Sequence, residues 1–253
     1  MADWFVIGPG IRRERSGASV MLYEPLRADN FNEFWFEPSW WAARGAIRGS
    51  GHGRGNTWFV DEGDRRYALR HYRRGGFAAR FSADRFLYMG ELSSRPLREF
   101  LLTVHLHALD LPVPAPVGAR LQRDGRSYRG DLLTEVIPRA RTLAERLSMG
   151  SVPVNEWLDI GRTIARFHVR GVFHADLNAH NLLIDDARRV WLIDFDRGDL
   201  RTPGLWCDAN LARLRRSILK VCDALSAGRF NETLWTALLA GYRAVRPPPR
   251  RDA

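Results

Sequence analysis

The stretch that decides the fold reads His174-Ala175-Asp176-Leu177-Asn178-Ala179-His180-Asn181 and continues through Leu182-Leu183-Ile184 and a turn into Val190-Trp191-Leu192-Ile193-Asp194-Phe195-Asp196. Its two short apolar runs, separated by a polar turn, predict a β-hairpin. A hairpin folds the chain back on itself, so residues before its first strand and after its second strand come close together. We therefore expect Asp176, Asn181 and Asp194 to converge on one site.

These three side chains are of the kinds that phosphoryl transfer requires. One carboxylate takes the proton of the acceptor hydroxyl, and further oxygen ligands hold Mg²⁺ on the nucleotide phosphates. The alternative is purely structural, since Asp and Asn are frequent turn residues and could cap the hairpin.

The order and spacing of these residues resemble the protein-kinase-like superfamily, whose catalytic loop reads His-Arg-Asp…Asn and whose metal motif reads Asp-Phe-Gly. The resemblance implies that Asp176 is the catalytic base, that Asn181 and Asp194 are the Mg²⁺ ligands, and that ATP is the phosphate donor. Two positions depart from the motifs. Ala175 replaces the arginine that commonly anchors a phosphorylated activation loop, and Asp196 replaces the glycine.

Working outward, the remaining chain divides into a strand-rich first half and a helix-rich second half. Strands are predicted at Ala18–Tyr23, Thr57–Val60, Tyr67–Tyr72, Pro116–Leu121 and Tyr128–Ile137, and helices at Val154–His168, Leu205–Leu225 and Glu232–Arg243. A helix beginning at Arg95-Pro96 repeats its apolar residues Leu97, Leu101, Val104 and Ala108 at helical spacing.

This order predicts an α+β fold with two lobes, a bilobal protein-kinase-like arrangement. We expect an N-terminal antiparallel sheet lobe over residues 1–137, including an extension over 1–48. A C-terminal catalytic lobe should cover 138–246, with a disordered tail at 247–253.

The first lobe contains the residues expected to hold the nucleotide. Glycines in the run Gly49–Gly55, notably Gly51, Gly53 and Gly55, would let backbone N–H groups approach phosphate, although a plain flexible linker has the same composition. The next strand has no lysine, so Arg70 is the candidate phosphate contact and Glu99 its ion-pair partner. The competing interpretation is a surface strand with solvated arginines.

Residues Thr134–Ile137 would form the hinge between the lobes, where Glu135 and Ile137 offer backbone polar groups to adenine.

A narrower resemblance rests on four segments: Gly53–Val60, Leu69–Gly76, Leu111–Pro116 and His174–Asn181. Together they are similar to the bacterial lipopolysaccharide-core kinase family, whose Kdo kinases act on 3-deoxy-D-manno-octulosonic acid. The resemblance implies ATP- and Mg²⁺-dependent phosphorylation of the 4-hydroxyl of Kdo on a lipid A precursor, Kdo-lipid IVA. It also implies a peripheral location at the cytoplasmic face of the inner membrane.

The charge balance agrees with an acidic partner. The 253 residues have a formal net charge of +10, and every basic residue except Lys220 is arginine. A basic protein surface attracts anionic lipid or a phosphorylated or carboxylated substrate. Arg73 and Arg74 are candidates for contacting the acid groups of such a substrate. No run of about 18 apolar residues predicts a membrane span.

The segment 31–48 has six aromatic residues among the eleven from Phe31 to Trp41, and Arg44 and Arg48 follow them. Such a composition is typical of an amphipathic membrane-facing anchor, and equally of a buried aromatic cluster.

Three other functions remain open at this stage. A small-molecule kinase of the aminoglycoside or choline type shares the Asp…Asn and Asp motifs, but its cationic substrates favour an acidic pocket. A non-catalytic pseudokinase that binds anionic lipid would explain the missing strand lysine. Nucleic-acid binding agrees with the charge, yet no helix-turn-helix, zinc-finger or RNA-recognition pattern accompanies the arginines.

Overall fold

The computed structural model describes residues 7–8, 10–28, 30–51, 57–73, 84–225 and 228–245. The chain forms two compact units. Unit 1 comprises Met1–His107 and Pro114–Val136, and unit 2 comprises Ala108–Val113 and Ile137–Ala253. The short segment Ala108–Val113 belongs to unit 2 because its backbone is tied there: the Leu192 N–H donates to the Pro112 carbonyl oxygen at 3.0 Å.

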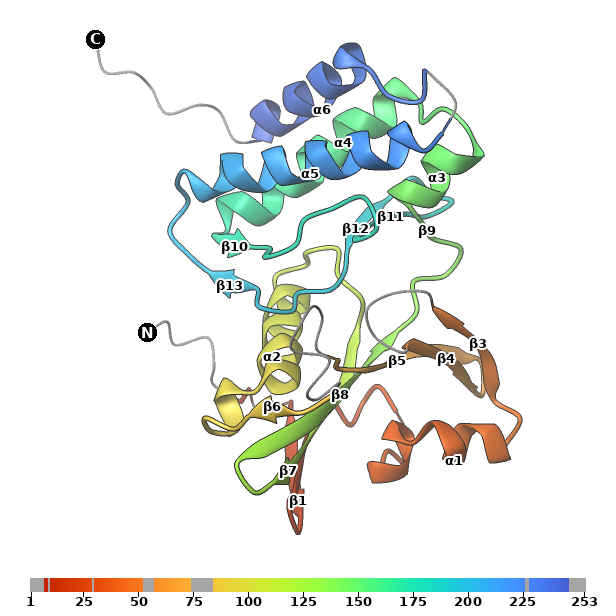
Figure 1. Ribbon diagram of the computed structural model, residues 1–253, viewed down its shortest axis with the longest axis vertical. Coiled ribbons are helices and arrows are strands. Elements are labelled where there is room, and N and C mark those ends of the chain that lie inside the picture. Colours follow the sequence, from red (N-terminus) through yellow and green to blue (C-terminus); the bar gives the residue numbers. More distant parts are fainter. Residues whose placement is uncertain are drawn as a thin grey trace. The chain divides into compact units, whose positions relative to one another are not determined.

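Unit 1 is built on one antiparallel sheet (Figure 1). Its strands are β1 (Arg12–Ser16), β2 (Ser19–Tyr23), β3 (Ile47–Gly51), β4 (Thr57–Glu62), β5 (Arg65–His71), β6 (Phe86–Leu87), β7 (Pro116–Asp124) and β8 (Ser127–Glu135). The order is β1-β2-β7-β8-β5-β4-β3, and β6 pairs with β8. The sheet and the helices of both units confirm the predicted α+β class.

Each face of the sheet is covered by a different segment. Helix α2 (Arg95–Ala108), which follows the short 3-10 helix η4 (Glu91–Ser93), packs its buried Leu97, Phe100 and Leu101 against one face. The 3-10 helix η2 (Glu33–Phe36) and helix α1 (Pro38–Ala43) supply apolar side chains to the other face. Because side chains alternate along a strand, successive residues of β5 belong to opposite faces.

The aromatic segment that begins at Phe31 belongs to the core. Trp35, Phe36 and Trp41 are at most 2% exposed, and the indole N–H of Trp41 donates to the Trp35 carbonyl oxygen at 2.8 Å. Phe34, at 53% exposure, is the large apolar side chain that this segment presents to solvent. Burial of these rings against the sheet favours the buried-cluster alternative for them, and the membrane-facing interpretation of 31–48 stays a prediction for the exposed residues of the segment.

Unit 2 is mainly helical (Figure 1). Its helices are α3 (Leu143–Met149), α4 (Val154–Val169), α5 (Trp206–Asp223) and α6 (Glu232–Val245); its short strands are β9 (Arg141–Thr142), β10 (Val172–Phe173), β11 (Leu182–Ile184), β12 (Val190–Leu192) and β13 (Asp199–Leu200). Strands β9, β11 and β12 form one small sheet, and β10 pairs with β13. The backbones of α4 and α6 approach closely at two glycines, Gly161 and Gly241, where an added Cβ would collide with the opposite helix.

The predicted long helices and the predicted strands are all present, with boundaries shifted by a few residues. Strand β1 has no sequence signal, because all five of its residues are exposed and it pairs at the edge of the sheet. Gly49 and Gly51 of the glycine run Gly49–Gly55 belong to strand β3 (Ile47–Gly51), in which Gly51 pairs with Thr57. Gly53, Gly55 and the tail 247–253 lie outside the described residues. Among the described helices, none has the length and apolar content to cross a bilayer.

Candidate active site

The predicted hairpin forms in unit 2, where β11 and β12 pair antiparallel with Leu182 opposite Leu192. The residue after β12, Ile193, is hydrogen-bonded at both of its backbone groups. Its N–H donates to the Asn181 carbonyl oxygen at 3.1 Å, and its carbonyl oxygen accepts from His174 Nε2 at 2.9 Å. These two bonds fasten the strand that leads into Asp194 to the loop that contains Asp176.

His174 stabilises this loop as a neutral imidazole. It is 2% exposed, and this burial lowers the pKa of its ring. Nε2–H donates to Ile193, while Nδ1 accepts the backbone N–H of Asp176 at 3.2 Å. A neutral imidazole has one donor and one acceptor, so both bonds are satisfied in a single tautomer. The ring also packs on Phe195, with centroids 5.0 Å apart.

The Asp176 carboxylate reaches solvent, with its side chain 53% exposed. Its backbone carbonyl oxygen accepts hydrogen bonds from the side-chain amides of Asn178 (3.1 Å) and Asn181 (2.9 Å), which shape the loop. Its Oδ1 pairs with Arg213 Nη1 of α5 at 3.0 Å. A carboxylate has two oxygens, so this arrangement leaves Oδ2 to accept a proton from a hydroxyl group.

The chemistry of Asn181 and Asp194 fits a magnesium ion. Asn181 is buried, and its Nδ2 is used by the Asp176 carbonyl, which leaves Oδ1 as the atom for a cation. Asp194 has φ = 64°, a left-handed conformation rare for a residue other than glycine and common at functional sites. Within the described ranges no three His, Cys, Asp or Glu side chains gather into a metal cage. Mg²⁺ on a nucleotide needs only one or two protein oxygens, because phosphates and water complete its shell.

In unit 1, Arg70 of β5 forms the expected ion pair with Glu99 of α2. Glu99 is 3% exposed. The Tyr72 hydroxyl joins both: it accepts from Arg70 Nη2 at 2.8 Å and donates to the Glu99 carboxylate. The Arg70 guanidinium carbon also lies 4.6 Å from the centre of the Tyr72 ring. The three side chains therefore form one ordered polar cluster on the face of the sheet that packs α2.

The other predicted nucleotide contacts belong to different elements of the chain. Glu135 ends β8, and its side chain lies 3.5 Å from the Arg65 guanidinium and 3.8 Å from that of Arg27. Ile137 is buried and is the first residue of the main part of unit 2. Gly51 ends β3.

Sequence reasoning missed two residues, Tyr72 and Arg213. Tyr72 had a usable signal, because residues two apart on an extended strand share a face and Arg70 was already a candidate. Arg213 had none, since its contact with Asp176 spans 37 residues and depends on how α5 packs.

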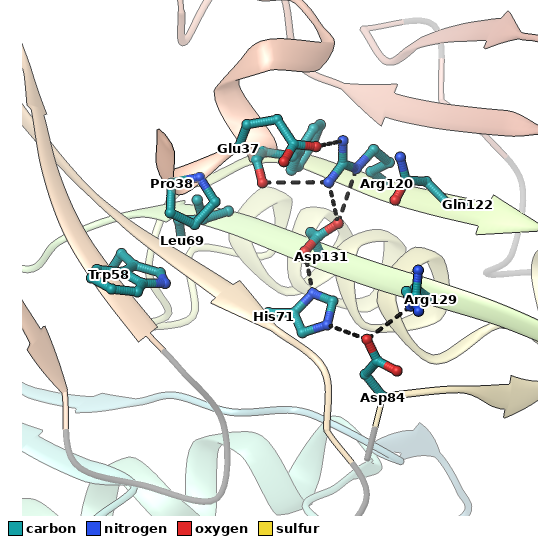
Figure 2. A pocket seen from close by; sticks show the side chains of 11 residues that line it. Glu37, Pro38, Trp58, Leu69, His71, Asp84, Arg120, Gln122, Arg129 and Asp131 are labelled. Atoms are coloured by element: carbon teal, nitrogen blue, oxygen red, sulfur yellow. Dashed lines mark hydrogen bonds and ion pairs between the residues drawn. The ribbon is translucent and has the colours of Figure 1, made fainter. Parts of the chain in front are cut away.

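The opposite face of the unit 1 sheet holds a pocket of about 340 Å³ (Figure 2). As Figure 2 shows, His71 lies between Asp131 (2.7 Å) and Asp84 (3.4 Å). The hydrogen bond to Asp131 raises the pKa of His71. Asp131 also pairs with Arg120 at 2.9 Å, and both are buried. The charged groups of this pocket are thus paired with one another.

Comparisons with known proteins bear on this site. The family model described as "Lipopolysaccharide kinase (Kdo/WaaP) family" matches residues 38–242. The chain is 44% identical over 210 residues to a curated protein of Xanthomonas campestris pv. campestris (strain B100) named 3-deoxy-D-manno-octulosonic acid kinase, covering 83% of this chain and 84% of that protein. Proteins of the same name from Xylella fastidiosa and Photobacterium profundum are 42% and 41% identical, covering 85% and 82% of this chain and 86% and 87% of those proteins.

Proposed function

The chain belongs to the lipopolysaccharide kinase (Kdo/WaaP) family, and we propose that it transfers the γ-phosphate of ATP to the 4-hydroxyl of a Kdo sugar on a lipid A precursor, Kdo-lipid IVA. The relatives named as 3-deoxy-D-manno-octulosonic acid kinases support this acceptor. The proposed chemistry depends on one observation. Two hydrogen bonds to the backbone groups of Ile193, one with Asn181 and one with the His174 ring, hold Asp194 beside the loop of Asp176 and Asn181.

Asp176 acts as the general base in this proposal. Its carboxylate orients the acceptor hydroxyl through Oδ2 and accepts the proton as the oxygen attacks phosphorus. The solvent-exposed side chain supports this role, because an acceptor sugar must reach it from outside. His174 holds the backbone of Asp176 in place and takes no proton itself, since burial keeps it neutral.

Asn181 and Asp194 would hold Mg²⁺, which neutralises charge on the phosphates during transfer. For unit 1 we propose that Arg70, held by Tyr72 and Glu99, binds phosphate with its guanidinium fork. Backbone groups of Gly51, Gly53, Gly55, Glu135 and Ile137 would contact the nucleotide, as the sequence predicts.

We further propose that the enzyme works peripherally at the cytoplasmic face of the inner membrane. A net charge of +10 supports attraction to an anionic leaflet and to an acceptor that bears phosphates and a carboxylate.

The test is incubation with labelled ATP, Mg²⁺ and Kdo-lipid IVA, followed by mass analysis of the product. We expect one added phosphate on Kdo, and Asp176→Ala should reduce turnover by about 10²–10⁴-fold. Transfer to an aminoglycoside or to choline, with none to the Kdo acceptor, would refute the proposal. Binding of nucleotide without any turnover would instead favour a pseudokinase.

A further inference from the structure

Helix α5 presents a basic stripe that begins at the catalytic carboxylate. Arg213, Arg216 and Lys220 occupy positions i, i+3 and i+7, which lie on one face of an α-helix, and all three are exposed. The stripe extends for about 10 Å, because each helical residue rises about 1.5 Å.

Two contacts one turn apart set the position of this stripe relative to the catalytic loop. Arg213 Nη1 lies 3.0 Å from Asp176 Oδ1, and Ser217 Oγ accepts the backbone N–H of Ala179 at 3.1 Å. The second bond anchors the helix to the loop backbone. Arg213 is therefore held next to the Asp176 carboxylate.

The stripe retains unused hydrogen-bond donors. A guanidinium has five N–H groups, and the bond to Asp176 employs one of those on Arg213. Among the described residues, Arg216 and Lys220 have no carboxylate within ion-pair distance. Exposed cations that surround a catalytic carboxylate raise the local concentration of anionic ligands.

We propose that this stripe binds the acidic groups of the acceptor: Arg213 binds the sugar carboxylate, and Arg216 and Lys220 bind phosphate groups further along the molecule. The inference deepens the proposed function and rests on it. In this arrangement Arg213 bridges two carboxylates, that of the enzyme and that of the substrate, which fixes the sugar ring with its hydroxyl at Asp176 Oδ2.

The experiment compares Arg213→Gln with a matched control, Arg162→Gln. Arg162 of α4 is 52% exposed and pairs with Asp159 at 2.9 Å, whereas Arg213 is 49% exposed and pairs with Asp176 at 3.0 Å. The two substitutions therefore remove ion pairs of similar length and arginine exposure from the same unit, one within a helix and one between α5 and the loop of Asp176. KM for Kdo-lipid IVA in detergent micelles and KM for ATP are measured for each protein.

We expect Arg213→Gln to raise the acceptor KM by about tenfold to a hundredfold, because the substitution removes a charge-assisted hydrogen bond to the acceptor. KM for ATP should stay unchanged. The double variant Arg216→Gln/Lys220→Gln should raise the acceptor KM by about threefold to tenfold. Arg162→Gln should match the parent.

An acceptor whose Kdo carboxylate is converted to the amide gives the decisive control. The parent should lose as much acceptor affinity with the amide as Arg213→Gln loses with the acid, and Arg213→Gln should respond little to the change. Equal sensitivity of both proteins to the amide, or a fall in kcat alone, would overturn the role of Arg213. A parent that phosphorylates no Kdo acceptor would refute the proposed function itself, and this result is distinct from the other two.

Discussion

Substitution of His174 by phenylalanine tests how the site is assembled. Phenylalanine keeps an aromatic ring against Phe195, although its ring is larger than imidazole, and it removes the bonds to the Ile193 carbonyl oxygen and the Asp176 N–H. Each lost bond costs about 1 kcal/mol, and up to about 3 kcal/mol where the backbone group stays buried without a partner. We therefore expect a loss of about 2–6 kcal/mol in the free energy of unfolding. No charge is lost near neutral pH, because burial lowers the pKa of His174 and the ring is neutral.

The assay is denaturant unfolding at about pH 7.5, above the usual titration range of histidine, with His180→Phe as the matched control. His180 belongs to the same loop but is exposed, so its substitution should change stability by less than about 0.5 kcal/mol. Turnover should fall in the His174 variant as well, since only the Ile193 N–H bond to the Asn181 carbonyl oxygen then ties Asp194 to the loop. Equal stability of the two variants would show that the imidazole bonds do not hold the site together.

Four further outcomes follow from the same contacts. Gly161→Ala should destabilise the protein by at least about 2 kcal/mol in thermal unfolding, because the added Cβ would collide with the Leu238 carbonyl oxygen where α4 packs on α6. Unchanged stability would mean that the two helices separate easily. Tyr72→Phe should raise KM for ATP by about threefold to tenfold through loss of the bond to Arg70, and an unchanged KM would contradict a role for the cluster. Asp194→Ala should abolish Mg²⁺-dependent nucleotide binding in calorimetry, whereas retained binding would remove it as a ligand. The raised pKa of His71 means that its ion pair stabilises the fold fully below about pH 6.5 and less as pH rises through the folded pKa. Unfolding of His71→Gln should therefore differ most from the parent at low pH, and a pH-independent difference would refute this.

The sequence by itself determined the elements whose signals are local. Apolar spacing predicted α2, α4, α5 and α6, and the two apolar runs around a polar turn predicted the β11–β12 hairpin. The order Asp176, Asn181, Asp194 was enough to expect one site, because pairing of two short strands has few alternatives.

Only the tertiary structure decided which way the aromatic segment faces and what neighbours Asp176. The aromatic composition around Trp35 and Trp41 is typical of an interface anchor and equally of a core. These rings are buried because strands distant in the sequence build an apolar sheet face on which they pack. The pairing of Asp176 with Arg213 depends on how α5 packs against the catalytic loop. Contacts of this kind arise from the packing of whole elements, and no local spacing of residues encodes them.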